Sequence, residues 1–276
     1  MSSLVVNSNL QALNAYNNLN QTDQAMTKAI SELSSGLQIQ TAADNPAGYV
    51  VAEGLQSQSN GYTQAISNAQ NGVSLIQTAS GAMNQITSIL QTMNSLALSS
   101  ANGATNDTQS LNANQQEFQA LANQIDQIAN TTSFGTTNLL NGNFQGQTLQ
   151  VGAFDSSSNQ LLLTISNMST SSMGINTASV SSASLAATAV TLVQNAISYV
   201  ASAEASVGAT QNQLNAIVAN LTVGQQNLQA AYSGLVDVNF AQETTTYSTD
   251  QILMQSGVAM LSQAQQSPSM VLKLLQ

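Results

Sequence analysis

The chain has 276 residues, but only Lys28 and Lys273 are cationic, and Arg, His, Cys and Trp do not occur. Twelve carboxylates give a formal net charge of −10, yet charged residues make up 5% of the chain, against roughly a quarter in ordinary soluble domains. The hydrophobic fraction of 42% is ordinary, so the uncharged polar residues Gln, Asn, Ser and Thr take the place of the missing charges.

This composition excludes most catalytic and binding classes. Ser-His-Asp and Cys-His sites need an imidazole or a thiol, a structural zinc site needs His or Cys, and a P-loop needs a Lys in a motif that the chain lacks. Paired carboxylates stay possible, but the acids stand singly along the sequence. Nucleic acids and anionic membrane surfaces are bound through clustered Lys and Arg. We therefore expect no enzyme, cofactor, metal site or nucleic-acid partner.

We also expect no membrane insertion and no cleaved secretion signal. No apolar run approaches the roughly 20 residues of a membrane span, and residues 1–10 lack a basic region followed by an apolar stretch.

The low charge has two explanations. Carboxylates with an ordinary pKa near 4 are largely neutral below about pH 3, so a polymer without Lys and Arg is almost uncharged in acid. This favours a protein that works outside the cell in acidic surroundings. Compositional drift is the alternative.

Both ends of the chain show helical seams, in which apolar residues recur in steps of three, four and seven. The N-terminal seam consists of Leu19, Met26, Ile30, Leu33 and Leu37, and the C-terminal seam of Tyr247, Met254, Val258 and Leu261. Pro268 follows the second seam and is expected to break or restart its helix.

Between the seams, Asp44 to Gly48 has the composition of a turn. Helical periodicity then covers residues 66–98, 111–128 and 185–235, with Gly224 as a weak point in the last. Residues 148–151 and 161–165 resemble strands separated by a polar turn. The predicted fold is mainly α, with long antiparallel helices, paired ends and a small β-hairpin region in the middle.

Several motifs follow one another along nearly the whole chain. They are Leu33-Ser34-Ser35-Gly36-Leu37 with residues 43–48, then residues 71–91, the hairpin at 148–165, Val207 to Asn212, and the C-terminal residues 251–253, 264–268 and 271–275. Together and in this order they are similar to the motifs of bacterial flagellins, so the chain resembles that family over nearly its whole length.

The resemblance implies a self-assembling structural subunit of the extracellular flagellar filament, exported unfolded. It implies a terminal coiled-coil domain made of residues 1–42 with 236–276, and a helical rod of residues 43–235 with its hairpin near 145–166. The expected partners are other copies of the chain, the export apparatus with its chaperone, and the cap and junction proteins. The nine seam residues would then drive polymerisation.

This chain departs from the flagellin pattern where the family usually has Arg or Lys, namely at Gln38, Thr92, Asn94, Gln127, Gln213 and Gln276. In this chain, Thr92, Leu96, Ser99 and Glu117 occupy positions that resemble the flagellin surface recognised by the Toll-like flagellin receptor. Because the arginine of that surface is replaced by Thr92, we expect weak recognition.

Because some flagellins carry O-linked sugars, the family resemblance makes O-glycosylation of this chain one expectation. A polar loop without sugar is the alternative. Candidate acceptors are Ser156, Ser157, Ser158, Ser169, Thr170, Ser171 and Ser172. Two alternatives to a filament subunit remain at this point: a hook–filament junction protein and a helical-bundle surface adhesin.

Overall fold

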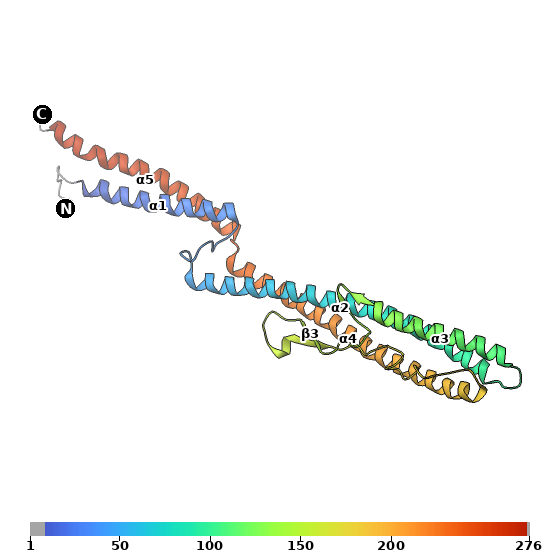
Figure 1. Ribbon diagram of the computed structural model, residues 1–276. Coiled ribbons are helices and arrows are strands. Elements are labelled where there is room, and N and C mark those ends of the chain that lie inside the picture. Colours follow the sequence, from blue (N-terminus) through green and yellow to red (C-terminus); the bar gives the residue numbers. More distant parts are fainter. Residues whose placement is uncertain (1–8, 275–276) are drawn as a thin grey trace. The chain divides into compact units, whose positions relative to one another are not determined.

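The computed structural model describes the backbone of residues 9–274 and the side chains of residues 9–266. Its long elements are helices (Figure 1): α1 (Leu10–Ser35), α2 (Pro46–Ala101), α3 (Thr108–Thr131), α4 (Ala183–Val236) and α5 (Phe240–Leu274). Between α3 and α4, β1 (Ser133–Phe134) pairs with β2 (Thr137–Asn138), and β3 (Gln147–Gln150) pairs with β4 (Gln160–Leu163) after the short 3-10 helix η1 (Ser157–Asn159). The predicted mainly α fold with a small β region is confirmed.

The chain forms two compact units. The terminal unit contains Met1–Ser57 and Asn227–Gln276, and the central unit contains Gln58–Gln226. The sequence placed the boundaries at 42/43 and 235/236. By contacts, the terminal unit also includes the first turns of α2 and the last turns of α4, and the family's domain boundaries stay a prediction.

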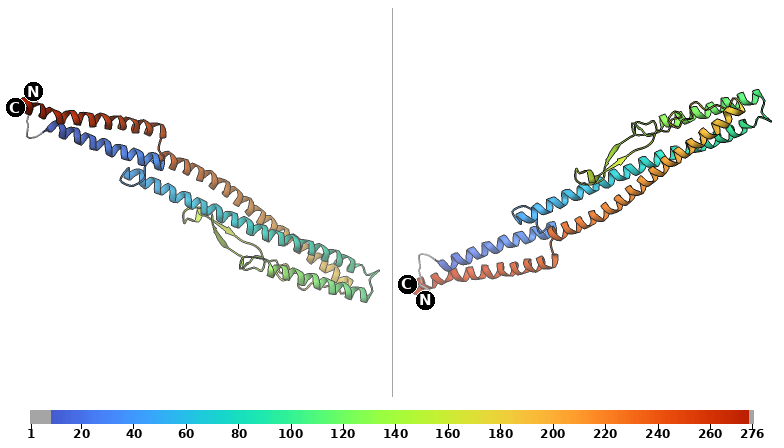
Figure 2. Two further views of the ribbon diagram at one scale, coloured as in Figure 1. Left: turned by 90° about the horizontal axis from the view of Figure 1, so that it is seen from above. Right: turned by 90° about the horizontal axis from the view of Figure 1, so that it is seen from below.

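In the central unit, α2 and α4 lie side by side and α3 packs along them (Figures 1 and 2). Both long helices bury a residue every three or four positions, which is the period of one helix face. On α4 the buried residues are mostly small, including Ala186, Ala189, Ala196 and Ala203, so the helices can approach closely. Larger side chains on the other elements fill the space between the helices, among them Met83, Leu90, Phe118, Ile165 and Met168.

The predicted hairpin is present and lies on α2. Strands β3 and β4 are antiparallel, with Leu149 opposite Leu161. The Leu149 side chain rests where α2 has Gly72, and a Cβ on Gly72 would be 2.6 Å from Leu149 Cδ2. The missing side chain therefore lets the hairpin approach the helix. The small pair of β1 with β2 was not predicted, because two-residue strands carry no periodicity.

Gly224, predicted to be a weak point of α4, packs against α2. The ring of Tyr62 on α2 lies against it, and a Cβ on Gly224 would be 2.7 Å from Tyr62 Cε2. The adjacent residues are linked by a 2.7 Å hydrogen bond from Gln225 Nε2 to Thr63 Oγ1. Gly224 is thus a site of close approach between α4 and α2.

By length and composition alone, α4 is the one described helix apolar enough to cross a membrane, and 28% of its most apolar 18-residue window is buried in the chain. Core helices of soluble proteins meet the same criterion. Here α4 contributes a face of buried residues from Ala186 to Leu214 to the core.

In the terminal unit, α1 and α5 run antiparallel and side by side (Figure 2). Gly36 ends α1 with a left-handed φ of 77°, and its N–H donates to the carbonyl of Glu32. The next residue, Leu37, pairs with Asp237 in an antiparallel bridge. This bridge joins the end of α1 to the segment between α4 and α5.

Two proline predictions need correction. Pro46 was placed in a turn, but it is the first residue of α2, where its fixed φ suits a helix and its missing N–H costs nothing. Asn45 caps that helix by accepting from Gly48 N–H at 2.9 Å. Pro268 was expected to break the last helix, yet α5 continues through it to Leu274. An internal proline costs the helix one hydrogen bond, which another donor can replace.

Candidate functional site

The contact between α1 and α5 is a heptad seam. On both helices a large apolar residue recurs every seventh position and is half-buried: Leu19, Met26 and Leu33 on α1, and Tyr247, Met254 and Leu261 on α5. Small or polar residues fill the alternate positions: Ala15, Thr22 and Ala29 on α1, and Glu243, Asp250, Gly257 and Ala264 on α5. This alternation is typical of a two-helix seam.

Leu19 and Gly257 show how the two helices interlock. Gly257 has no side chain, and a Cβ built there would be 3.0 Å from Leu19 Cδ1. The leucine therefore packs directly against the backbone of α5. The apolar pattern of the sequence favours Val258 at this position, because Val258 is the larger apolar residue next to Gly257.

Not every predicted seam residue lies in the intramolecular seam. Leu19, Met26, Leu33, Leu37, Tyr247, Met254 and Leu261 are half-buried, whereas Ile30 is 48% exposed and Val258 is 53% exposed. Their places are taken by the neighbouring small residues Ala29 and Gly257, which permit close approach. A role of Ile30 and Val258 in polymerisation stays a prediction.

The outer faces of α1 and α5 carry large apolar side chains that the chain itself leaves largely exposed. On α1, Leu10, Leu13 and Tyr16 are 66%, 55% and 52% exposed and follow one another in steps of three. On α5, Ile252, Leu253, Val258 and Met260 are between 51% and 65% exposed. We call these residues, together with Ile30, the outer apolar face. Exposed apolar side chains of this size are available for burial against other molecules.

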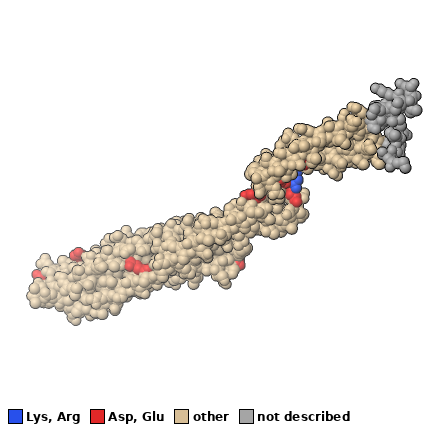
Figure 3. Space-filling model, turned by 180° about the vertical axis from the view of Figure 1, so that it is seen from behind, with Lys and Arg blue, Asp and Glu red and all other residues tan. Residues whose placement is uncertain are grey.

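Charges are sparse and local (Figure 3). Lys28 Nζ lies 3.6 Å from Glu32 Oε1 and 3.7 Å from Asp44 Oδ1, which are the ion pairs of the described residues. Glu32 is 7% exposed, so its charge has lost most of its water. The one cation with a described side chain thus neutralises the most buried carboxylate of the terminal unit.

The pKa values of two carboxylates in this unit are shifted in opposite directions. Burial, followed by repulsion from Glu32 and Asp250, raises the pKa of Glu243 above its usual value, with Lys28 opposing the shift. The pKa of Asp44 is lowered, chiefly because the backbone N–H and hydroxyl of Thr41 donate to it. The α1–α5 seam is therefore favoured by protonation of Glu243, and the loop that precedes α2 by ionisation of Asp44.

The residues that resemble the receptor-recognition surface lie on the central unit. Thr92 and Ser99 on α2 and Glu117 on α3 are exposed, and Leu96 is half-buried. A hydrogen bond from Asn114 Nδ2 to Ser100 Oγ, 3.0 Å long, places these parts of α2 and α3 at the same level. The hydroxyl of Thr92 donates to Ser88 of its own helix and so offers no outward donor.

The predicted glycan acceptors differ in accessibility. Ser156, Ser157, Ser158, Ser171 and Ser172 are exposed, and Ser169 is half-buried. Thr170 is only 6% exposed and its hydroxyl donates to Asp126, so it cannot accept a sugar in the folded chain. Glycosylation stays a prediction, and Thr170 is the least accessible of the candidates, because a polar run of sequence does not reveal a buried turn.

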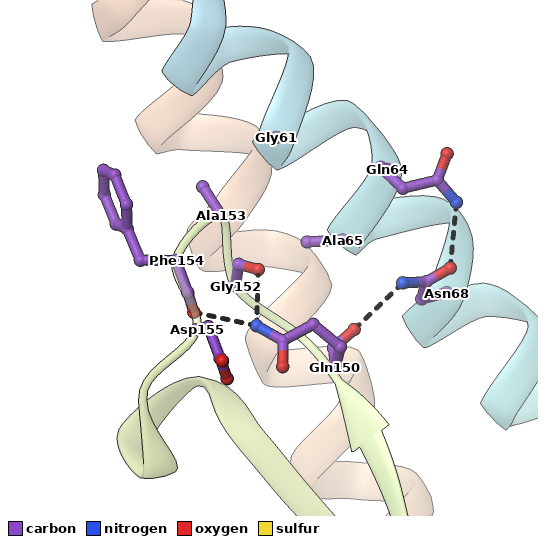
Figure 4. Close-up of a pocket in the computed structure, with 9 residues that line it drawn as sticks. All are labelled: Gly61, Gln64, Ala65, Asn68, Gln150, Gly152, Ala153, Phe154 and Asp155. Atoms are coloured by element: carbon purple, nitrogen blue, oxygen red, sulfur yellow. Dashed lines mark hydrogen bonds between the residues drawn. The ribbon is translucent and has the colours of Figure 1, made fainter.

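A shallow hollow of about 430 Å³ lies between α2 and the segment that follows β3 (Figure 4). Gln150 crosses its floor and donates to the carbonyls of Gly152 and Phe154, while Asn68 donates to the Gln150 carbonyl. These amides are satisfied by the chain itself. In the described part of the chain, no group of three or more metal-ligating side chains comes together.

A helix pair whose outward side chains are largely apolar and exposed is typical of structural proteins that associate with other molecules. The comparisons with known proteins agree. The N-terminal helical region of bacterial flagellin matches residues 6–145, and the C-terminal helical region of bacterial flagellin matches residues 190–275. The chain belongs to the bacterial flagellin family, whose members are structural proteins of the extracellular flagellar filament and not enzymes.

Relatives match along their full length. A flagellin of Halalkalibacterium halodurans is 38% identical over 99% of this chain and 100% of its own, and a flagellin of Bacillus subtilis is 35% identical over 98% and 99%. Among solved structures, a Bacillus cereus flagellin has a TM-score of 0.50 at 27% identity, covering 60% of this chain and 94% of its own. A putative flagellar hook-associated protein from Vibrio parahaemolyticus has a TM-score of 0.59 over 70% of this chain and 100% of its own, but at 13% identity it shows the fold alone.

Proposed function

We propose that this chain polymerises into a flagellar filament through the outer apolar face of its α1–α5 pair, with the seam residues holding the pair together. The observation that carries the proposal is the exposure of Leu10, Leu13 and Tyr16 on α1 and of Ile252 and Met260 on α5. Burial of such side chains against neighbouring copies contributes about 1.5–3 kcal/mol each.

Assembly of purified protein, followed by electron microscopy and by measurement of the critical concentration, tests this surface. The double variant Leu13→Gln, Val258→Gln should not assemble, whereas the control Leu13→Met, Val258→Ile keeps apolar volume and should form filaments. Both should keep the wild-type helix content by circular dichroism. Normal assembly of the glutamine variant would refute the proposed surface, and discrete particles from the wild type would favour an adhesin.

We infer further that the terminal helices become ordered on assembly. Their seam is only half-buried within one chain, and helices with so little buried face are marginal alone. Residues 26–37 and 254–261 should exchange amide hydrogens quickly in the soluble chain and slowly in the filament. Strong protection of both segments in the soluble chain would contradict coupled ordering.

Two finer proposals rest on the family resemblance and on composition. The export apparatus, its chaperone, and the cap and junction proteins are the further partners. Acidic surroundings are the proposed working medium, because the near absence of cations leaves an assembly almost uncharged when its carboxylates protonate. Filaments should then persist near pH 2 and be no more stable near pH 7. Steep loss of their melting temperature on acidification would refute the acid proposal alone.

A further inference from the structure

Asn9, directly before α1, makes two hydrogen bonds with one side chain. Its Oδ1 accepts from the backbone N–H of Ala12 at 3.0 Å, which caps α1. Its Nδ2 donates to the backbone carbonyl of Ala264 on α5 at 2.7 Å, across 255 positions of sequence. The cap of one helix is therefore also a bond to its partner helix.

The carbonyl that Asn9 contacts lacks the usual i+4 donor of its own helix. In an α-helix the carbonyl of residue i accepts from the N–H of residue i+4. For Ala264 that residue is Pro268, which has no N–H, and α5 nevertheless continues to Leu274. Pro268 is the only proline in α5, so no other α5 carbonyl is left open by a proline inside the helix.

The contact between Asn9 and Ala264 lies at one end of the α1–α5 pair. The other end of the α1–α5 pair is held by the backbone bridge of Leu37 with Asp237. The first turns of α1 have no such bridge, and Leu10 and Leu13 point away from the pair with exposures of 66% and 55%. The Asn9 contact is thus a polar link between the two helices at this end.

We propose that Asn9 and Pro268 act together as a distal clasp of the α1–α5 pair. Pro268 frees the Ala264 carbonyl, Asn9 Nδ2 occupies it, and the same side chain starts α1 through Oδ1. The Asn9 side chain therefore couples the start of α1 to the pairing of α1 with α5. The clasp forms wherever α1 and α5 are paired within one chain, so its effect on exchange should be largest in the assembled sample, where the proposed function has these helices ordered.

A mutant cycle separates the two roles of Asn9. Asn9→Asp keeps the acceptor that caps α1 but replaces the donor by a carboxylate oxygen, which repels the Ala264 carbonyl. Pro268→Ala restores the helical donor to Ala264. The measurement is amide exchange of residues 10–16 in the full-length chain at pH 7, in soluble and assembled samples. Residues 76–90 in the core of the central unit serve as the internal reference.

With Pro268 present, Asn9→Asp should accelerate exchange of residues 10–16 by on the order of tenfold, the value of about one hydrogen bond. In the Pro268→Ala background, the same substitution should change exchange less than about twofold. An equal effect in both backgrounds, or none with Pro268, would overturn the clasp. Altered exchange of residues 76–90 would report general misfolding, and Asn9→Ser, which caps but cannot reach Ala264, then replaces Asn9→Asp in the cycle.

Discussion

The carboxylate of Asp126 on α3 accepts two hydrogen bonds from Thr170, one from its backbone N–H to Oδ1 and one from its hydroxyl to Oδ2, each 2.8 Å long. Thr170 is 6% exposed and belongs to the segment that leads from β4 to α4. The pair therefore fastens this segment to α3 within the central unit.

Replacement of Asp126 by Ala should destabilise the central unit by about 2–4 kcal/mol, because both donors of Thr170 stay buried without an acceptor. Urea denaturation followed by circular dichroism measures the change. Asp155→Ala removes an exposed carboxylate that makes one 3.3 Å contact, to Gln160, and should cost less than about 0.5 kcal/mol. Equal midpoints for the two variants would show that the Asp126 contact contributes nothing.

Gly61 and Gly81 lie on the same helix and should respond oppositely to Ala. A Cβ on Gly61 would be 2.6 Å from Ala153 Cβ and 3.1 Å from its backbone Cα, whereas nothing lies within 4 Å of a Cβ on Gly81. Gly81→Ala should stabilise by roughly 0.5–1 kcal/mol through helix propensity. Gly61→Ala should instead destabilise the chain, because the backbone at Ala153 must move away from the new methyl group and this cost exceeds the gain in helix propensity. Thermal melting of both variants decides, and a more stable Gly61→Ala would contradict the close approach in Figure 4.

Glu243 and Asp44 should give opposite pH dependences in the terminal unit. The pKa of Glu243 is raised, so its contribution is full below its unfolded pKa near 4.5 and is lost as pH rises through the folded value. Glu243→Gln resembles the protonated form and should raise the melting temperature at pH 7, with a gain that vanishes near pH 3.

The pKa of Asp44 is lowered, so its contribution is present above its unfolded pKa near 3.8 and is lost as pH falls through the folded value. Asp44→Asn should therefore reduce stability at pH 7 and have little effect at low pH. Melting or filament dissociation across pH 2–8 compares the two variants. The same sign of effect for both at pH 7 would contradict the assigned shifts.

Soluble chain should activate the Toll-like flagellin receptor weakly. Thr92 is exposed, but its hydroxyl is bonded to its own helix and cannot replace the forked donors of Arg. Thr92→Arg should raise the response of reporter cells, whereas Thr78→Arg, on an equivalent exposed hydroxyl that donates to Ser74, should not. Wild-type potency equal to that of an Arg-bearing flagellin would refute the prediction.

Any O-linked sugar on the native protein should lie on Ser156, Ser157, Ser158, Ser171 or Ser172, whose side chains are exposed. Peptide mass spectrometry of protein from its source locates it. A sugar on Thr170 would require that the Asp126 contact be open in the folded chain, and an intact mass equal to the bare 28.6 kDa would show that there is no modification.

Much of this protein follows from its sequence alone. Composition excludes catalysis by Ser-His-Asp or Cys-His sites and zinc sites built from His or Cys, because those side chains do not occur. Periodicity predicts the long helices and the paired ends, since one buried face imposes its spacing on each helix. The collinear motifs indicate the family, and the strand alternation predicts the β3–β4 hairpin.

The tertiary structure alone decided which small residues matter. The sequence favoured Ile30 and Val258 for the seam, but packing selected Ala29 and Gly257, because close approach of two backbones requires the smaller side chain. In the same way, Pro268 by itself favours the end of a helix. In the structure α5 continues through Pro268, and Asn9 donates to the carbonyl of Ala264. A pattern along the chain records what each residue prefers locally, whereas a donor supplied from 255 positions away depends on where the chain folds back.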